Sequence, residues 1–159
     1  MKYIYLFTFF AVLFLFNSCE DGLAPRNADE KSFLNGKIIF KNHLPKDSIE
    51  AIRGVAFTKM PDSNIIADVM QGYAYFNFES LPIGEDTIDF SFEITKTPVD
   101  LLYIAAIMQT DTSIFSQRVI GVYTETGDKT KHSALKIQTG KSYNVVIDVD
   151  FNDLPPMPF

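Results

Sequence analysis

The 159-residue chain has little of the residue types from which metal and catalytic centres are usually built. It contains one cysteine, two histidines and no tryptophan. A single cysteine excludes an intramolecular disulfide, so burial of β-branched and aromatic side chains must hold the fold together. The histidines, His43 and His132, lie in separate polar segments, whereas a metal centre needs several converging ligands. We therefore expect no metal and no cofactor.

Clustered positive charge and known catalytic motifs are also missing. The chain has 14 Lys and Arg against 20 Asp and Glu, a net charge of −6 at pH 7. Without a basic cluster it lacks what a phosphate backbone needs, which argues against a nucleic-acid partner. It contains no Gly-x-Ser-x-Gly, phosphate-binding loop or His-Glu-x-x-His sequence. We predict that the protein is not an enzyme.

The one long apolar run lies at the N-terminus, over Tyr3–Phe16. As a helix these residues would rise about 21 Å, short of a hydrocarbon core of about 30 Å. A basic residue precedes the run and short polar residues follow it, which is typical of a secretory signal peptide. We predict a signal peptide over residues 1–18, in preference to an uncleaved transmembrane anchor.

The lone cysteine follows this run directly. Phe16-Asn17-Ser18-Cys19 resembles a bacterial lipobox, Leu-(Ala/Ser)-(Gly/Ala/Ser)-Cys, and departs from it at Phe16 and Asn17. The resemblance implies cleavage before Cys19, a diacylglycerol thioether on that residue and an acyl chain such as palmitate on its amino group. Two or more chains anchor a protein stably in a membrane. The alternative is a secreted protein with a free thiol.

Residues 19–32 have the composition of a flexible linker, rich in Asp, Asn, Ala, Gly and Pro. At its start, Glu20-Asp21 resembles the acidic surface-export signal of some Gram-negative lipoproteins, although an ordinary acidic linker is the alternative. We expect a lipid-anchored protein of the cell envelope, in the outer membrane of a Gram-negative bacterium and exposed at its surface.

Residues 33–152 show the alternation of β-strands. The clearest segment is Ile88–Thr95, in which Phe90 and Phe92 fall on one face and Ser91 on the other. Leu101–Met108 is apolar on both faces, which predicts a central strand covered on both sides. The other predicted strands are Leu34–Lys41, Ile52–Lys59, Val69–Phe78, Arg118–Thr124, Ala134–Ile137 and Tyr143–Phe151. We predict an all-β fold, a single antiparallel β-sandwich of about 7–8 strands.

Convincing helical periodicity is missing after residue 32, although Ile49–Arg53 could open a short helical turn. Residues 153–159 form a Pro-rich tail, Asp-Leu-Pro-Pro-Met-Pro-Phe. A frayed terminus is favoured over a docking peptide for this tail.

Two short motifs resemble transthyretin-like and carboxypeptidase-regulatory-like domains, which are Ig-type β-sandwiches. One is Leu34-Asn35-Gly36-Lys37-Ile38, and the other is the Phe…Leu-Pro-x-Gly turn at 78–84. The tyrosine usual soon after that glycine is replaced by Thr87-Ile88. The resemblance implies an architecture but no activity.

Two residue groups could bind a ligand. Asp148 and Asp150, with Asn152, have the spacing of a calcium loop, but Asp153 occupies the position of its glycine. We therefore favour a position on the solvent-exposed face of a strand over a calcium site for these residues. Tyr73 and Tyr75 fall on one face of a predicted strand and could stack on sugar rings, with ordinary sheet packing as the favoured alternative.

These features predict a lipoprotein with a structural, adhesion or assembly role at the cell envelope. The alternative is an extracellular glycan- or polymer-binding module. The expected partners are the membrane, through the lipid on Cys19, and a protein or glycan of the envelope.

Overall fold

The computed structural model describes residues 30–42, 49–62, 65–113 and 116–159. Cys19 and His43 lie outside these ranges. Lys31–Phe159 forms one compact unit, and its described residues are mostly β-strand with one short helix. No helix in the described ranges has the length and hydrophobicity that a membrane span requires.

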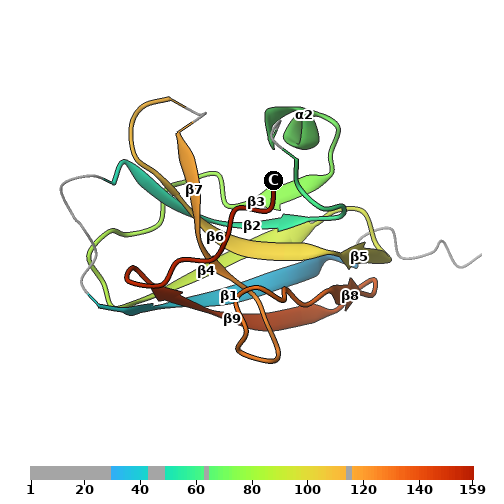
Figure 1. Ribbon diagram of the computed structural model, residues 1–159. Coiled ribbons are helices and arrows are strands. Elements are labelled where there is room, and N and C mark those ends of the chain that lie inside the picture. Colours follow the sequence, from blue (N-terminus) through green and yellow to red (C-terminus); the bar gives the residue numbers. More distant parts are fainter. Residues whose placement is uncertain (1–29, 43–48, 63–64, 114–115) are drawn as a thin grey trace, which may run out of the picture. The chain divides into compact units, whose positions relative to one another are not determined.

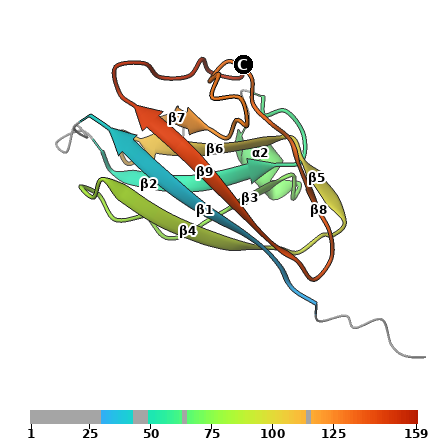
Figure 2. The ribbon, with the colours of Figure 1, turned by 90° about the horizontal axis from the view of Figure 1, so that it is seen from below.

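The first sheet has three strands, with β1 (Ser32–Lys41) between β4 (Thr87–Ile94) and β9 (Ser142–Asp150), as Figure 2 shows. β1 pairs with β4 antiparallel but with β9 parallel. The prediction of purely antiparallel pairing is therefore wrong for this sheet. Parallel neighbours need a long connection, and nearly the whole domain lies between these two strands in the sequence.

The second sheet is antiparallel and has the order β3 (Ala74–Phe76), β2 (Ala51–Phe57), β6 (Tyr103–Gln109), β7 (Gln117–Val122). Figure 1 shows β1, β4 and β9 in a different layer from β2 and β6. Every residue of β6 except Met108 is buried, which confirms the predicted central strand. Leu101 belongs instead to β5 (Val99–Leu101), which pairs with β8 (Leu135–Ile137) in a small third sheet.

The main core takes side chains from both larger sheets. Phe90 and Phe92 of β4 are buried while Ser91 between them is exposed, so the predicted alternation is confirmed. A Cβ on Gly36 of β1 would lie 1.9 Å from a Phe90 ring atom, and one on Gly54 of β2 would lie 2.6 Å from that ring. The glycine of the Leu-x-Gly-x-Ile motif therefore leaves room for the Phe90 ring.

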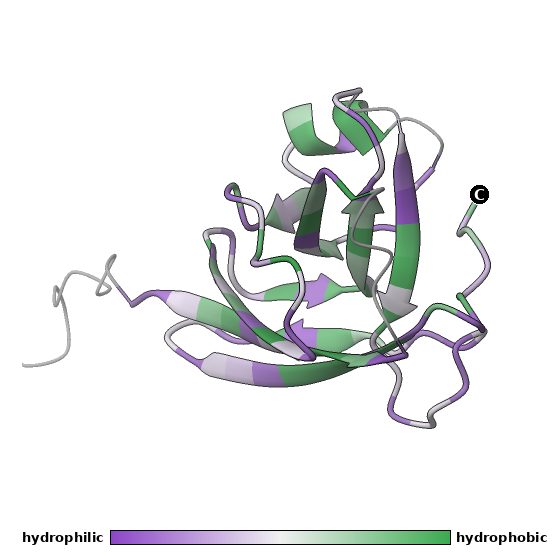
Figure 3. Cartoon of the chain, turned by 90° about the vertical axis from the view of Figure 1, so that its left-hand side faces the viewer, coloured by the Kyte–Doolittle hydropathy of each residue, from purple (hydrophilic) through white to green (hydrophobic). Residues whose placement is uncertain are grey.

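The predicted strand Val69–Phe78 is correct only in its middle. The helix α2 (Ile65–Met70) covers its first residues, Gly72 turns the chain with a φ of 73°, and only β3 is a strand. Six helical residues are less than two turns, too few to show a 3.6-residue repeat. Figure 3 shows α2 as mostly hydrophobic. The suggested helical turn at Ile49–Arg53 is also wrong, because β2 begins at Ala51.

A second apolar cluster covers the other face of the β3-β2-β6-β7 sheet. Its buried members are Val55, Phe57, Tyr103, Ala105, Ile107, Val119 and Val122. Ile65 of α2 and Met157 of the C-terminal tail both pack against this cluster. Pro155 is fully buried and Leu154 packs against the main core, so the tail is packed rather than frayed.

Candidate functional site

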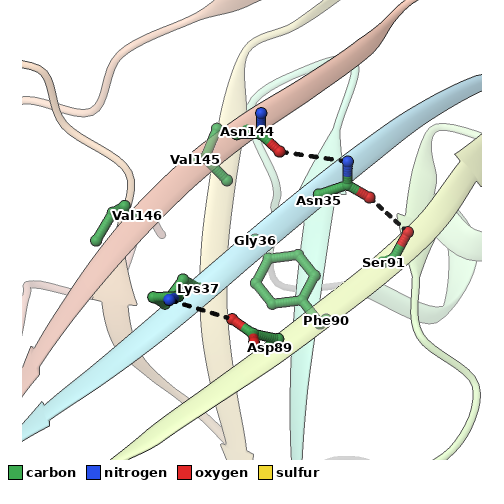
Figure 4. Close-up of a pocket in the computed structure, with 9 residues that line it drawn as sticks. All are labelled: Asn35, Gly36, Lys37, Asp89, Phe90, Ser91, Asn144, Val145 and Val146. Atoms are coloured by element: carbon green, nitrogen blue, oxygen red, sulfur yellow. Dashed lines mark hydrogen bonds and ion pairs between the residues drawn. The ribbon is translucent and has the colours of Figure 1, made fainter.

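A groove with a volume of about 580 Å³ lies on the solvent-facing side of the β4-β1-β9 sheet. Figure 4 shows its lining, which all three strands contribute. The lining residues are Asn35, Gly36, Lys37, Asp89, Phe90, Ser91, Asn144, Val145 and Val146. We call it the polar groove. Its polar side chains share one face because the wet face of each strand meets the wet faces of its neighbours in register.

One side of the polar groove is a row of three hydrogen-bonded side chains. Strand register places Asn35 of β1 opposite Ser91 of β4 and Asn144 of β9. The Ser91 hydroxyl donates to Asn35 Oδ1 at 2.8 Å, and Asn35 Nδ2 donates to Asn144 Oδ1 at 3.3 Å (Figure 4). The central asparagine thus joins all three strands, and both side-chain amides retain unused hydrogen-bonding capacity.

The other side of the polar groove is a row two residues further along the strands. Lys37 Nζ lies 3.9 Å from Asp89 Oδ1, and Val146 beside them is 51% exposed. Amides, a hydroxyl, an ion pair and a small apolar surface therefore face solvent together. Such a set can bind a hydroxylated ligand. The Ser91 hydroxyl donates to an amide oxygen rather than to a base, so this contact does not activate it as a nucleophile.

The carboxylates with calcium-like spacing lie on the same sheet face and are already paired. Asp148 accepts a 2.6 Å contact from Lys41 Nζ, and this hydrogen bond raises the pKa of Lys41. The backbone N–H of Asn152 lowers the pKa of Asp150, with a smaller contribution from Asn42 Nδ2 at 2.7 Å. Among the described residues no group of three or more His, Cys, Asp or Glu could hold a metal ion.

The two tyrosines are in different surroundings. Tyr73, just before β3, is 41% exposed, and the Lys59 ammonium lies 5.4 Å from its ring centroid. Tyr75 packs against the main core, and no described residue bonds its buried hydroxyl. Tyr73 is therefore the member whose ring is open to a ligand. Neither tyrosine lines the polar groove.

His132 packs against the ring of a buried tyrosine. Its ring centroid lies 5.3 Å from that of Tyr103, whose burial raises its pKa to about 12. This contact gives no arrangement for proton transfer, since a phenol with that pKa stays protonated near neutral pH.

Asn35, Lys37 and Asn144 were not singled out from the sequence as binding residues. Alternation placed each strand's polar residues on a wet face, which is a usable signal. The register that sets Asn35 between Ser91 and Asn144 depends on pairing between segments more than fifty residues apart, and no local pattern encodes it.

Comparison with known proteins finds no matching family model, no similar curated protein and no similar solved structure. Function must therefore be argued from the chain's own residues.

Proposed function

We propose that this chain is a lipid-anchored, non-enzymatic protein of the bacterial cell envelope, with a structural, adhesion or assembly role. The observation that carries the proposal is Ser18-Cys19 at the end of the only long apolar run, followed by a linker and a β-rich domain. A cysteine in that place is what lipoprotein maturation uses, and the chain offers no second cysteine for a disulfide. The outer membrane and its surface are the proposed location.

The proposed domain type is a β-sandwich of the transthyretin-like or carboxypeptidase-regulatory-like kind. Supporting it, the Phe90 ring from β4 approaches Gly36 of β1 and Gly54 of β2, which belong to different sheets. One apolar layer shared by two sheets is the arrangement that defines a sandwich. The parallel pairing of β1 with β9 is a feature that any family assignment must accommodate.

Substitution of the cysteine tests the anchor. Cys19→Ala should abolish incorporation of labelled palmitate and release or mislocalise the protein. Ser18→Ala is the matched control, because the lipobox accepts alanine at that position, and it should leave both readouts unchanged. Palmitate labelling that persists in Cys19→Ala would disprove the anchor.

A second function, binding of an extracellular glycan or polymer, is favoured by the polar groove. Asn35 is its central residue, so Asn35→Ala should weaken any saccharide found on a glycan array by about tenfold, the loss of one or two hydrogen bonds. Tyr73→Ala tests whether the saccharide binds at the exposed tyrosine instead of in the polar groove. Saccharide binding lost in Tyr73→Ala but kept in Asn35→Ala would assign it to the tyrosine instead.

A further inference from the structure

A second groove, of about 270 Å³, lies on the opposite sheet, between α2 and the β3-β2-β6-β7 surface. We call it the apolar groove. Its walls are mainly aliphatic and aromatic, with Val55, Ile65, Val69, Ala74 and Phe76 among the lining residues. No described residue lines both this groove and the polar groove.

The polar lining residues of the apolar groove gather at one end. Register places Gln109 opposite Gln117, and Arg53 opposite Ile107 in the next row. All three side chains line the groove. The groove therefore has an apolar end and a polar end. Apolar side chains surround it near α2 and β3, and a cation with two amides lies at the other end.

The Arg53 guanidinium is fixed in place, and no carboxylate of the described residues pairs with it. Its Nη1 donates to Gln109 Oε1 at 3.1 Å, and Gln109 in turn donates to the backbone oxygen of Asp111 at 2.7 Å. None of the ion pairs among the described residues involves Arg53. A half-buried cation beside apolar surface is stabilised by a carboxylate, which a guanidinium binds through two parallel hydrogen bonds.

Two further features of the apolar groove point to an occupant. Gln117 Oε1 is buried, and no described residue donates to it. Rotation of that amide by 180° would put donors there instead, which an acceptor ligand can use. At the rim Phe78 is 85% exposed, with its ring stacked on Phe76 at 5.7 Å. An aromatic side chain this exposed gains from being covered.

From this juxtaposition we infer that the apolar groove binds a small apolar carboxylate, with the hydrocarbon among α2, β2 and β3 and the carboxylate on Arg53. The volume of about 270 Å³ is just below the roughly 300–1,000 Å³ of pockets for drug-sized ligands, which suits a smaller molecule. Charge complementarity selects a carboxylate over an alcohol or an amine of the same chain length. The inference does not depend on the proposed anchor at Cys19 or on the polar groove.

Titration of the full chain with carboxyl-labelled octanoate, followed by NMR of the labelled carbon, tests the site. Octanol and octylamine are the comparison ligands, since they share the hydrocarbon and lack the carboxylate. Arg53→Met should weaken octanoate binding at least about tenfold, the usual loss for a hydrogen-bonded ion pair. Octanol should bind the native chain more weakly than octanoate and should be little affected by that substitution.

Arg118→Met is the matched control, because Arg118 lies on β7 but does not line the groove. Partition of octanoate into the apolar N-terminal run is common to every variant, so the difference between Arg53→Met and Arg118→Met reports the site. Phe78→Ser, a change at an exposed position, should weaken octanoate and octanol alike. Circular dichroism confirms that each variant is folded, and Arg53→Lys, which keeps the charge, should retain part of the affinity.

The inference is overturned if the native chain binds octanoate no better than octanol. It is overturned equally if Arg53→Met and Arg118→Met bind octanoate alike, or if Phe78→Ser has no effect on either ligand. Preferential binding of octylamine would also overturn the inference, because the site would then prefer a cation to a carboxylate.

Discussion

At the residue scale, one phenylalanine packs closely against glycines of both larger sheets. The Phe90 ring occupies space that the missing side chains of Gly36 and Gly54 leave open, one on each larger sheet. Ser91, the next residue, is on the exposed face of the same strand. These neighbours should therefore respond very differently to the same substitution.

Phe90→Ala should lower the free energy of unfolding by about 3–5 kcal/mol, because it removes buried apolar surface and leaves a cavity. Ser91→Ala should change it by no more than about 0.5 kcal/mol, since its hydrogen bond to Asn35 is exposed. Chemical denaturation of the full chain measures both. Equal losses would contradict the assignment of these side chains to opposite faces.

Gly36→Ala tests the same contact from the other strand. The added methyl group would overlap the Phe90 ring, and overpacking of this kind costs about 1–3 kcal/mol. Phe90→Leu combined with Gly36→Ala should cost less than the sum of the two single changes, because a smaller side chain makes room for the methyl group. Simple additivity in this double-mutant cycle would show that the two residues do not share the space.

The Asp150 carboxylate should titrate below its usual pKa of 3.8. Its pKa is depressed in the folded state, so its contribution to stability is complete above the unfolded-state pKa and is lost as the pH falls through the folded-state value. Asn42→Ala should raise the Asp150 pKa only part of the way back to its usual value, because the hydrogen bond from the Asn152 N–H lowers this pKa more than the one from Asn42. NMR of the carboxyl carbon across the acid range measures the Asp150 pKa. Lys37→Ala is the control and should leave this pKa unchanged, because Lys37 does not contribute to its shift.

At the element scale, strands with one wet face and the buried central strand β6 could be predicted from the sequence, and the short helix α2 could not. β4 and β9 alternate because one face meets solvent and the other the core. α2 was missed because it is short and because its buried residue is a polar one, Asp68, which is 1% exposed. The sequence predicts that the polar side chains of the polar groove face solvent. It does not predict that they lie together, because that depends on the register between three strands that are distant in the sequence.

The buried Asp68 makes α2 dependent on one lysine. Lys59 Nζ lies 2.6 Å from Asp68 Oδ1 and 3.2 Å from Asp62 Oδ2. Lys59→Met should destabilise the domain, because it leaves a buried carboxylate without its cation, and adding Asp68→Asn should restore part of the loss. Thermal unfolding compares these variants with Lys31→Met, whose partner Glu93 is exposed and whose loss should matter little.

At the scale of the whole domain, the C-terminal tail is part of the packed structure. Deletion of residues 154–159 would remove the buried Pro155 and the contacts of Leu154 and Met157 with the two clusters. We expect a loss of roughly 2–5 kcal/mol, comparable with truncation of one or two core side chains. Deletion of Pro158 and Phe159 alone is the control and should cost little, so equal unfolding midpoints for the two deletions would contradict the packed tail.

The parallel pairing of β1 with β9 also has a consequence for the order of events during folding. β1 is the central strand of its sheet, and its partner along one edge is more than a hundred residues away in the sequence. Pairings of such long range are slow to form, because the ends of a large loop must meet before any contact is gained. A nascent chain that still lacks β9 cannot complete this sheet, so a chain emerging from the ribosome stays without its complete native core until β9 is available. Such a delay is compatible with passage through a membrane channel that admits only unfolded polypeptide.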